Sequence, residues 1–163
     1  MHEKSIAHLD LKSPNILISS YDPSETCAKL TDFGTSDHIN DSSVFPTVDN
    51  PVWLAPEIIN KEILSVKADT YSYGVVLWEL LCRDKYFSEL TFMVDIVDQI
   101  RAGIRPTIPA HCPEIYKEVL TSCWHQIPWN RAEWPWVITK LNEILVDDPK
   151  MEEIFSAIDE EKL

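Results

Sequence analysis

The sequence predicts a mainly α-helical domain that carries one small β-hairpin, an α+β arrangement in which helix dominates. Apolar residues recur with helical spacing in four stretches, which are residues 67–83, 91–102, 113–124 and 134–146. Two short runs of β-favouring residues lie close together near the start of the chain. With 163 residues and 45% hydrophobic content, the chain can bury one core, so we expect one compact domain.

The predicted hairpin joins Ile16–Ser19 to Ala28–Thr31 through the segment SYDPSET, whose Asp-Pro pair and serines favour a turn. We expect a register in which the first residue of one run faces the last residue of the other. Antiparallel pairing in that register brings Asn15, just before the first strand, beside Asp32, just after the second. The open end of the hairpin would then present two oxygen-bearing side chains together.

The rest of the chain divides into a loop, a central helix, three outer helices and a tail. Residues 34–50 are polar and show neither strand nor helix period, which predicts a long surface loop. The stretch 67–83 is apolar nearly all round, which predicts a helix in the middle of the domain, and Asp69 is placed to cap its start. The three later helices are amphipathic. Residues 147–163 are acidic and predict a tail that is either a short surface helix or a frayed end.

Composition excludes several classes of partner and location. A formal net charge of -13 argues against a nucleic-acid surface, although a local site that meets anions through metal ions stays open. The four cysteines form no C-x-x-C pair, which indicates reduced core thiols rather than a zinc site. No apolar run reaches the roughly 18 residues of a membrane span, and the N-terminus lacks the apolar region of a secretory signal. We therefore expect a soluble, cytoplasmic protein.

Four polar residues near the hairpin mouth carry the candidate chemistry: Asp10, Lys12, Asn15 and Asp32. Carboxylate and amide oxygens suit Mg²⁺, which takes a few hard oxygen ligands together with substrate phosphates and waters. A lysine can meet a phosphate as a point charge, and a free carboxylate can orient a hydroxyl nucleophile. Taken singly, each of the four is more often a turn, cap or solvated residue. Their joint occurrence favours a site for phosphoryl transfer.

Three motifs recur here in the order seen in one large enzyme family. They are HLDLKSPN at residues 8–15, DFG at 32–34 and APE at 55–57, and they continue into KADTYSYGVVLWELL and PWNRA. The sequence therefore resembles the eukaryotic protein kinases over about residues 1–146, and is most similar to tyrosine-kinase-like serine/threonine kinases of the Roco and Raf type. The resemblance implies the C-terminal lobe of a kinase domain, ATP and Mg²⁺ as cofactors, and a protein as substrate.

The resemblance also implies roles for particular residues. Asp10 would accept or orient the proton of the substrate hydroxyl, and Lys12 would contact the transferred phosphate. Asn15 and Asp32 would ligate Mg²⁺, and Leu17 would lie under the adenine ring of the nucleotide.

A second group would have scaffold roles, and its members are His8, Phe33, Gly34, Glu57, Asp69 and Arg131. In the family, His8 and Phe33 would stack, and Asp69 would bond the backbone of the loop that carries Asp10. Glu57 would pair with Arg131 in a buried salt bridge, which is costly to break from one side only.

Parts of the family pattern are missing. The G-x-G-x-x-G loop and the paired lysine of the upper lobe do not occur, and the only glycines are Gly34, Gly74 and Gly103. We therefore expect an upper lobe or other upstream domains outside this sequence, and exposed apolar surface around Leu17 and Phe33. Leu9 stands where most members carry an arginine that pairs with a phosphorylated loop, which argues against switching by that route.

Three functions are compatible with these features. The first is an ATP-dependent protein kinase, with serine/threonine specificity favoured because Lys12 follows Asp10 by two positions. The second is a catalytically inactive, kinase-like binding module, which the missing upper lobe would favour. The third is a metal-dependent phosphohydrolase that uses Asp10 and Asp32, but it explains none of the later motifs.

Overall fold

The computed structural model describes residues 1–20, 22, 25–40, 44–47 and 50–147. Almost all of the predicted acidic tail, from residue 148 onward, lies outside the described residues. The α-helices of the described part are α1 (Pro56–Ile59), α2 (Lys67–Cys82), α3 (Met93–Arg101), α4 (Glu114–Cys123) and α5 (Trp134–Asp147). The strands are β1 (Ile6–Ala7), β2 (Ile16–Ile18), β3 (Ala28–Leu30) and β4 (Asp37–His38). Single 3-10 turns are η1 (His2–Lys4), η2 (Ser13–Asn15), η3 (Phe33–Thr35), η4 (Pro51–Trp53) and η5 (Pro128–Asn130).

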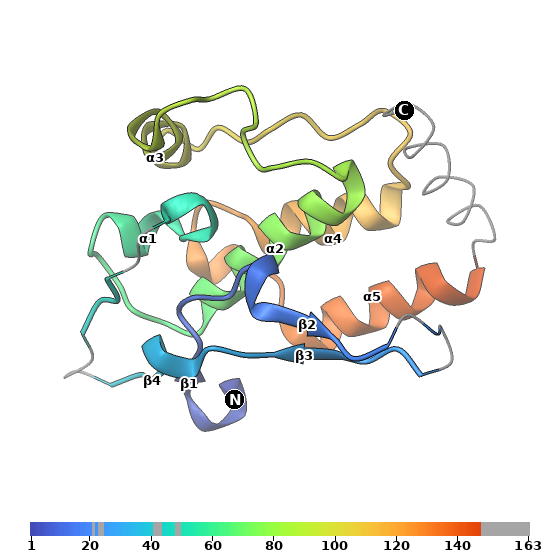
Figure 1. Ribbon diagram of the computed structural model, residues 1–163, viewed down its shortest axis with the longest axis horizontal. Coiled ribbons are helices and arrows are strands. Elements are labelled where there is room, and N and C mark those ends of the chain that lie inside the picture. The colour runs from blue at the N-terminus through green and yellow to red at the C-terminus, as the bar shows by residue number, and fades with distance from the viewer. Residues whose placement is uncertain (21, 23–24, 41–43, 48–49, 148–163) are drawn as a thin grey trace.

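The prediction of a mainly helical fold with a small β-hairpin is confirmed. Each of the four long helices lies within two residues of its predicted range at both ends. Helix α2 runs through the middle of the molecule, with α1 and α3 toward one side and the strands toward the other (Figure 1). Its side chains are buried on most faces, as the apolar pattern predicts, and α4 packs against both α2 and α5. The core therefore surrounds α2.

The contact between α2 and α4 depends on Gly74. A methyl group at this position would lie 3.0 Å from Cβ of Cys123 and 3.0 Å from the backbone nitrogen of Trp124. The backbone of Trp124 cannot move away from such a methyl group as the end of a flexible side chain could. The close approach of the two helices therefore requires glycine, although glycine costs about 1 kcal/mol of helix propensity relative to alanine.

We expect Gly74→Ala to destabilise the protein by roughly 1–3 kcal/mol, because overpacking against fixed backbone outweighs the gain in helix propensity. Urea denaturation followed by circular dichroism measures the free energy of unfolding. Glu118→Ala, at an exposed position of α4, is the control, since it raises helix propensity without a steric contact. Equal or higher stability of Gly74→Ala would mean that the helices separate easily.

The hairpin has a register one residue away from the predicted one. Ile16 pairs with Leu30, Leu17 with Lys29 and Ile18 with Ala28. Thr31 does not face Ile16, because its backbone N–H donates to the carbonyl oxygen of Asn15 at 2.9 Å. Its hydroxyl donates to the same carbonyl oxygen at 3.2 Å. Asn15 is therefore opposite Thr31, one position before Asp32.

The prediction that residues 34–50 form an entirely irregular loop is wrong at its start. Residues 33–35 form the turn η3, and β4 pairs antiparallel with β1 through Ile6 with His38 and Ala7 with Asp37. Two-residue strands are too short to show a period in the sequence. Residues 41–43 and 48–49 of the predicted loop lie outside the described residues.

Two further predictions need correction. Asp69 does not cap α2, since the N-cap residue is Val66 and Asp69 lies inside the first turn, where it bonds another segment. Cys27 is exposed in the hairpin connection, so it is not a core thiol. Cys112 and Cys123 are buried, as predicted, and burial raises the pKa of these thiols to about 11 and about 12. Both therefore remain protonated and unreactive at neutral pH.

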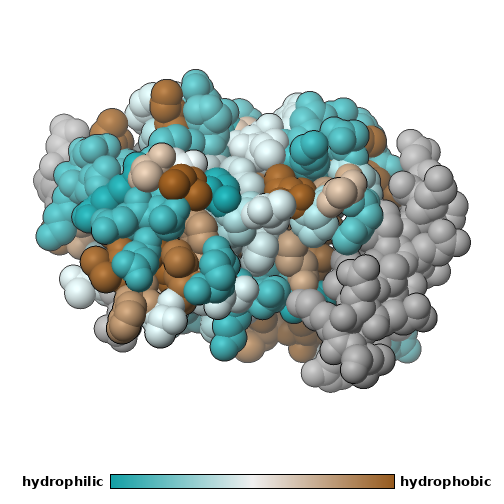
Figure 2. Space-filling view, turned by 90° about the horizontal axis from the view of Figure 1, so that it is seen from above, coloured by the Kyte–Doolittle hydropathy of each residue, from teal (hydrophilic) through white to brown (hydrophobic). Residues whose placement is uncertain are grey.

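The surface of the described residues is mainly polar, with some exposed apolar side chains. The face on the α3 side is hydrophilic over most of its area, with apolar side chains in several separate spots (Figure 2). None of the helices in the described ranges combines the length and the apolar character of a membrane-spanning segment.

Candidate functional site

The polar residues predicted from the HLDLKSPN motif lie together on the segment between β1 and β2, which we call the 8–15 loop. Lys12 Nζ donates to Asp10 Oδ2 at 2.7 Å. Asn15 Nδ2 donates to the backbone oxygen of Asp10 at 2.9 Å and to its Oδ2 at 3.2 Å. The Asp10 carboxylate is therefore fixed by an ammonium and an amide, and its position relative to both is defined before any ligand binds.

The buried side chain of His8 holds the 8–15 loop in place through both of its ring nitrogens. Its side chain is 1% exposed, and its Nε2 lies 2.9 Å from the carbonyl oxygen of Thr31, to which it must donate. Its Nδ1 then accepts the N–H of Asp10, at 3.3 Å. The ring also stacks against Phe33, with centroids 5.0 Å apart and planes tilted by 57°. His8 thus joins the loop to β3 and to the DFG turn, and its two ring nitrogens are both occupied.

Asp32 begins the turn η3 with a left-handed backbone, at φ 60° and ψ 69°. Aspartate tolerates this conformation better than most residues, yet it costs roughly 1–2 kcal/mol. A methyl group on Gly34 would lie only 3.3 Å from Asp32 Oδ1, so glycine leaves room for that carboxylate. Thr31 lies opposite Asn15, the last residue of the 8–15 loop, and the exposed Asp32 directly follows Thr31.

The donor set fits a magnesium ion. The amide nitrogen of Asn15 donates to Asp10, so Oδ1 is the side-chain atom that remains to bind a cation. Asp32 is exposed and contributes carboxylate oxygens. Within the described ranges, no group of three His, Cys, Asp or Glu side chains is arranged to hold a metal ion. Few protein ligands are what Mg²⁺ requires when phosphates and waters complete its shell, whereas zinc would need a fuller set.

The apolar surface predicted around the site is present. The side chains of Leu17, Ile18 and Phe33 are 54%, 53% and 51% exposed, which confirms the expectation of open apolar surface around Leu17 and Phe33. Leu17 and Ile18 are consecutive residues of β2, so their side chains lie on opposite faces of the hairpin.

Asp69 of α2 fixes the backbone of the 8–15 loop. Its carboxylate is 4% exposed and accepts the N–H of His8 at 2.8 Å and the N–H of Leu9 at 2.9 Å. Leu9 has φ 65°, a left-handed conformation that a leucine adopts only when surrounding bonds hold it. The bond from Asp69 to the loop backbone is the contact that the kinase resemblance implies.

Glu57 and Arg131 form a bidentate ion pair. Nη1 and Nη2 of Arg131 each lie 2.6 Å from a carboxylate oxygen of Glu57, and the two side chains are 0% and 3% exposed. Arg131 also donates to the backbone oxygens of Lys67 and His125, at 2.9 and 2.8 Å. One guanidinium therefore connects α1, the start of α2 and the segment before η5.

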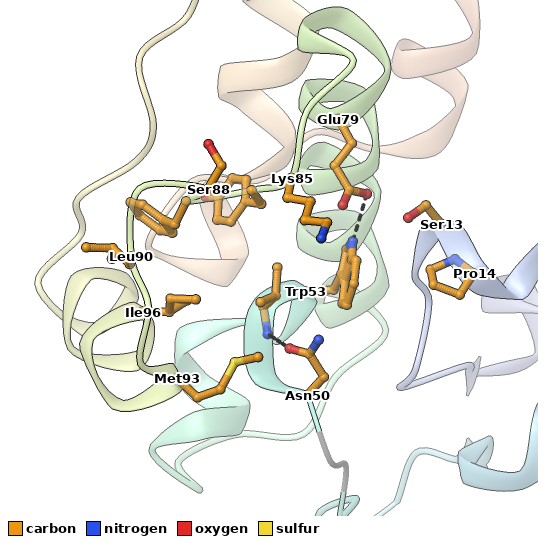
Figure 3. A pocket seen from close by; sticks show the side chains of 13 residues that line it. Ser13, Pro14, Asn50, Trp53, Glu79, Lys85, Ser88, Leu90, Met93 and Ile96 are labelled. Carbon is orange, nitrogen blue, oxygen red and sulfur yellow. Dashed lines mark hydrogen bonds between the residues drawn. The ribbon is translucent and has the colours of Figure 1, made fainter.

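A pocket that the sequence did not reveal lies beside the 8–15 loop (Figure 3). It has a volume of about 530 Å³, and its lining comes from η2, η4, the end of α2, the connection to α3 and α3 itself. Glu79 Oε2 accepts the indole N–H of Trp53 at 2.9 Å, and Asn50 caps η4 by accepting the N–H of Val52. Ser13 of the 8–15 loop lines the same pocket.

Burial raises the pKa of Glu79 above its usual value, and hydrogen bonds from Trp53 and Ser13 oppose part of that rise. The lone carboxylate in the apolar run VVLWELL was the available sequence signal for this residue. Periodicity could not show that Trp53 and Ser13, from distant segments, would face it. The pocket thus combines a half-buried acid with an apolar wall that includes Leu90 and Ile96.

A model of the protein tyrosine and serine/threonine kinase family matches residues 1–141. Because this match covers most of the chain, the protein belongs to that family, and its helices and small sheets are those of a kinase C-terminal lobe.

The chain is similar to serine/threonine kinases in particular. It is 45% identical over 140 residues to the probable serine/threonine-protein kinase roco9 of Dictyostelium discoideum, a match that spans 86% of this chain. It is 39% identical over 155 residues, or 92% of this chain, to the probable serine/threonine-protein kinase pats1 of the same organism. It is 36% identical over 143 residues, or 87% of this chain, to mitogen-activated protein kinase kinase kinase 12 of Rattus norvegicus. The matches span only 4%, 5% and 16% of the lengths of these three relatives.

Proposed function

We propose that the chain is the catalytic lobe of a serine/threonine protein kinase that transfers the γ-phosphate of ATP to a hydroxyl group of a protein in the cytoplasm. One observation carries this proposal, which is the convergence of Asp10, Lys12 and Asn15 within hydrogen-bond distance on one rigid loop. A retired catalyst would be expected to lose one of these groups. The similarity to serine/threonine kinases supports the choice of acceptor.

Asp10 acts on the acceptor. Its carboxylate accepts a hydrogen bond from the substrate hydroxyl and takes the proton as the oxygen attacks the γ-phosphorus. The new O–P bond forms as the bond from the γ-phosphorus to the bridging oxygen breaks, and ADP leaves with that electron pair. Lys12, whose ammonium lies 2.7 Å from Asp10, is close enough to the base to contact the transferred phosphoryl group.

Asn15 and Asp32 would hold the magnesium ion, and Leu17 would support the adenine ring of the nucleotide. When bound, Mg²⁺ supplies neutralisation of the negative charge on the phosphates. The hydrogen bond from Asn15 to Asp10 orients the Asn15 side chain, and the left-handed turn at Asp32 positions its carboxylate. The exposed side chains of Leu17 and Phe33 face the part of the nucleotide site that residues outside this sequence complete.

The pocket lined by Ser13 and Glu79 receives a side chain of the protein substrate. Ser13 and Pro14 of the loop that carries Asp10 line it, as does Asn50, the residue that caps η4. An extended peptide that places its hydroxyl at Asp10 would pass this pocket. We assign residues 1–146 to the lobe and residues 147–163, on their composition alone, to an acidic tail.

The experiment compares the 163-residue chain with a longer polypeptide that includes the upstream sequence of its own gene. We expect the longer protein to phosphorylate itself or a general protein substrate on serine or threonine in the presence of Mg-ATP. We expect the short chain to bind ATP weakly, because an open half-site leaves its charges screened by water. Phosphoamino acid analysis identifies the acceptor, and isothermal titration measures the affinity for ATP.

Two results would contradict this account. Micromolar binding of ATP by the 163-residue chain would show that the site is already complete. A longer protein that binds Mg-ATP but transfers no phosphate would instead favour the inactive, kinase-like binding module.

A further inference from the structure

His2 connects two distant parts of the chain to the 8–15 loop. Its Nε2 lies 2.7 Å from Oδ2 of Asp69, the same carboxylate that accepts the N–H groups of His8 and Leu9. Its Nδ1 lies 2.7 Å from the indole Nε1 of Trp134, the first residue of α5. Trp134 and His2 are 132 positions apart in the sequence, so neither the motifs nor the periodicity indicates their contact.

The partners of His2 determine where its proton lies. An indole nitrogen can only donate, so Nδ1 of His2 must accept and carries no hydrogen. The proton of the neutral ring is therefore on Nε2, which donates to the Asp69 carboxylate. The bonds all run in one direction, from the Trp134 N–H through His2 to Asp69. Opposite polarity at either end would leave two donors or two acceptors facing each other.

Trp134 is itself held in place. Its ring packs on Tyr73 of α2, with centroids 5.1 Å apart, and on His2 at 5.7 Å. The neighbouring Glu133 pairs with Lys67 at 2.6 Å, and Lys67 also donates to the backbone oxygen of Ala132 at 3.2 Å. The start of α5 is thus tied to the start of α2, and the indole N–H has a fixed direction.

The position of Asp69 matters because the loop backbone is strained. Leu9 has φ 65°, and its N–H depends on Asp69 Oδ1 at 2.9 Å. The side chain of His2 is 20% exposed, so water reaches the ring and competes for its bonds. A donor on Nδ1 restricts the rotation of the ring and keeps Nε2 directed at the carboxylate.

We propose that Trp134 is a positioning residue for the 8–15 loop: its indole N–H fixes the tautomer and orientation of His2, whose other N–H orients the Asp69 carboxylate that holds His8 and Leu9. Trp134 does not touch the reacting groups. Its effect on phosphoryl transfer rests on the proposed function, but its effect on the loop backbone does not.

Hydrogen exchange at the amides of His8 and Leu9, measured by NMR on the 163-residue chain, tests the proposal. Trp134→Phe keeps an aromatic ring beside Tyr73 but removes the indole N–H, and we expect roughly fivefold faster exchange at both amides, as for one lost hydrogen bond. Trp136→Phe is the matched control, because it removes an indole from the same helix that is not the His2 donor. We expect it to leave both amides unchanged.

A double-mutant comparison distinguishes a relay from loss of packing. His2→Phe removes both bonds, so it should speed exchange further, and adding Trp134→Phe to it should have no extra effect. His2→Gln retains an N–H for Asp69 and should restore part of the protection. Additive effects of Trp134→Phe and His2→Phe, or unchanged exchange in Trp134→Phe, would overturn the proposal.

The kinase assay of the longer protein is read separately. We expect Trp134→Phe to lower kcat by roughly tenfold with little change in the KM for ATP, since misplacement of a catalytic loop affects the chemical step. If no variant, including the unmodified protein, transfers phosphate, the proposed function fails while the exchange data still decide the role of Trp134.

Discussion

Replacement of Asp10 with Asn is expected to lower the rate of phosphoryl transfer by at least about a thousandfold in a polypeptide that contains this lobe and an upper lobe. Asparagine has nearly the same shape, so the bond to Lys12 is retained through its oxygen while the ability to take a proton is lost. The steady-state rate with Mg-ATP and a protein substrate measures the effect. The affinity for ATP should change little, because Asp10 acts on the acceptor hydroxyl.

Two further variants are compared with Asp10→Asn, one at a proposed magnesium ligand and one at an exposed control position. Asp32→Asn should reduce the rate to a similar extent and should also weaken binding of Mg-ATP, since it removes a proposed magnesium ligand. Asp98→Asn, on the exposed surface of α3, is the control and should have no effect. A turnover rate in Asp10→Asn equal to that of the unmodified protein would remove Asp10 from the mechanism.

The second large effect concerns stability. Arg131→Met is expected to destabilise the lobe by about 3–5 kcal/mol, because it leaves the Glu57 carboxylate buried without its partner. The backbone oxygens of Lys67 and His125 lose a donor in the same variant. Urea denaturation at neutral pH gives the difference in the free energy of unfolding.

A matched pair of variants shows whether the loss comes from an unpaired charge. Removing both partners, as Glu57→Leu with Arg131→Met, should cost less than Arg131→Met alone, since no buried charge is then left without compensation. Arg101→Met removes an exposed ion pair with Asp98 and an exposed hydrogen bond to Asn60, and should change stability by less than about 1 kcal/mol. If Arg131→Met were as mild as Arg101→Met, the buried pair would not hold α1 and α2 together.

Local patterns were sufficient for the four long helices, but not for the four-residue helix α1 or for the register of the hairpin. Helix α2 could be placed because an apolar run of its length has few other solutions. The hairpin register was wrong by one residue, since it depended on the bonds of Thr31 to the backbone of Asn15, which no periodicity encodes. Strand β4 was missed because its only partner is another two-residue strand.

In the candidate site too, contacts between residues close in sequence could be predicted from local patterns, whereas contacts between distant segments could not. The residues of the 8–15 loop could be predicted because they are close in sequence and typical of one chemistry. Helical spacing assigned the Asp69 carboxylate to a helix cap, which was wrong, whereas the kinase resemblance implied its bonds to the loop backbone, which the structure shows at the left-handed Leu9. Glu79 and Trp134 were not singled out because their partners come from segments far away in the chain.

The most direct test of the central claim is phosphoryl transfer by the native polypeptide. An antibody against the segment Trp134–Asp147 isolates it from its own cells, and ATP labelled at the γ-phosphate is supplied with Mg²⁺. We predict labelled phosphoserine or phosphothreonine, and loss of the label when the same polypeptide carries Asp10→Asn. Equal labelling with the Asp10→Asn protein, or no labelling by a native polypeptide that binds Mg-ATP, would contradict a catalytic role for this lobe.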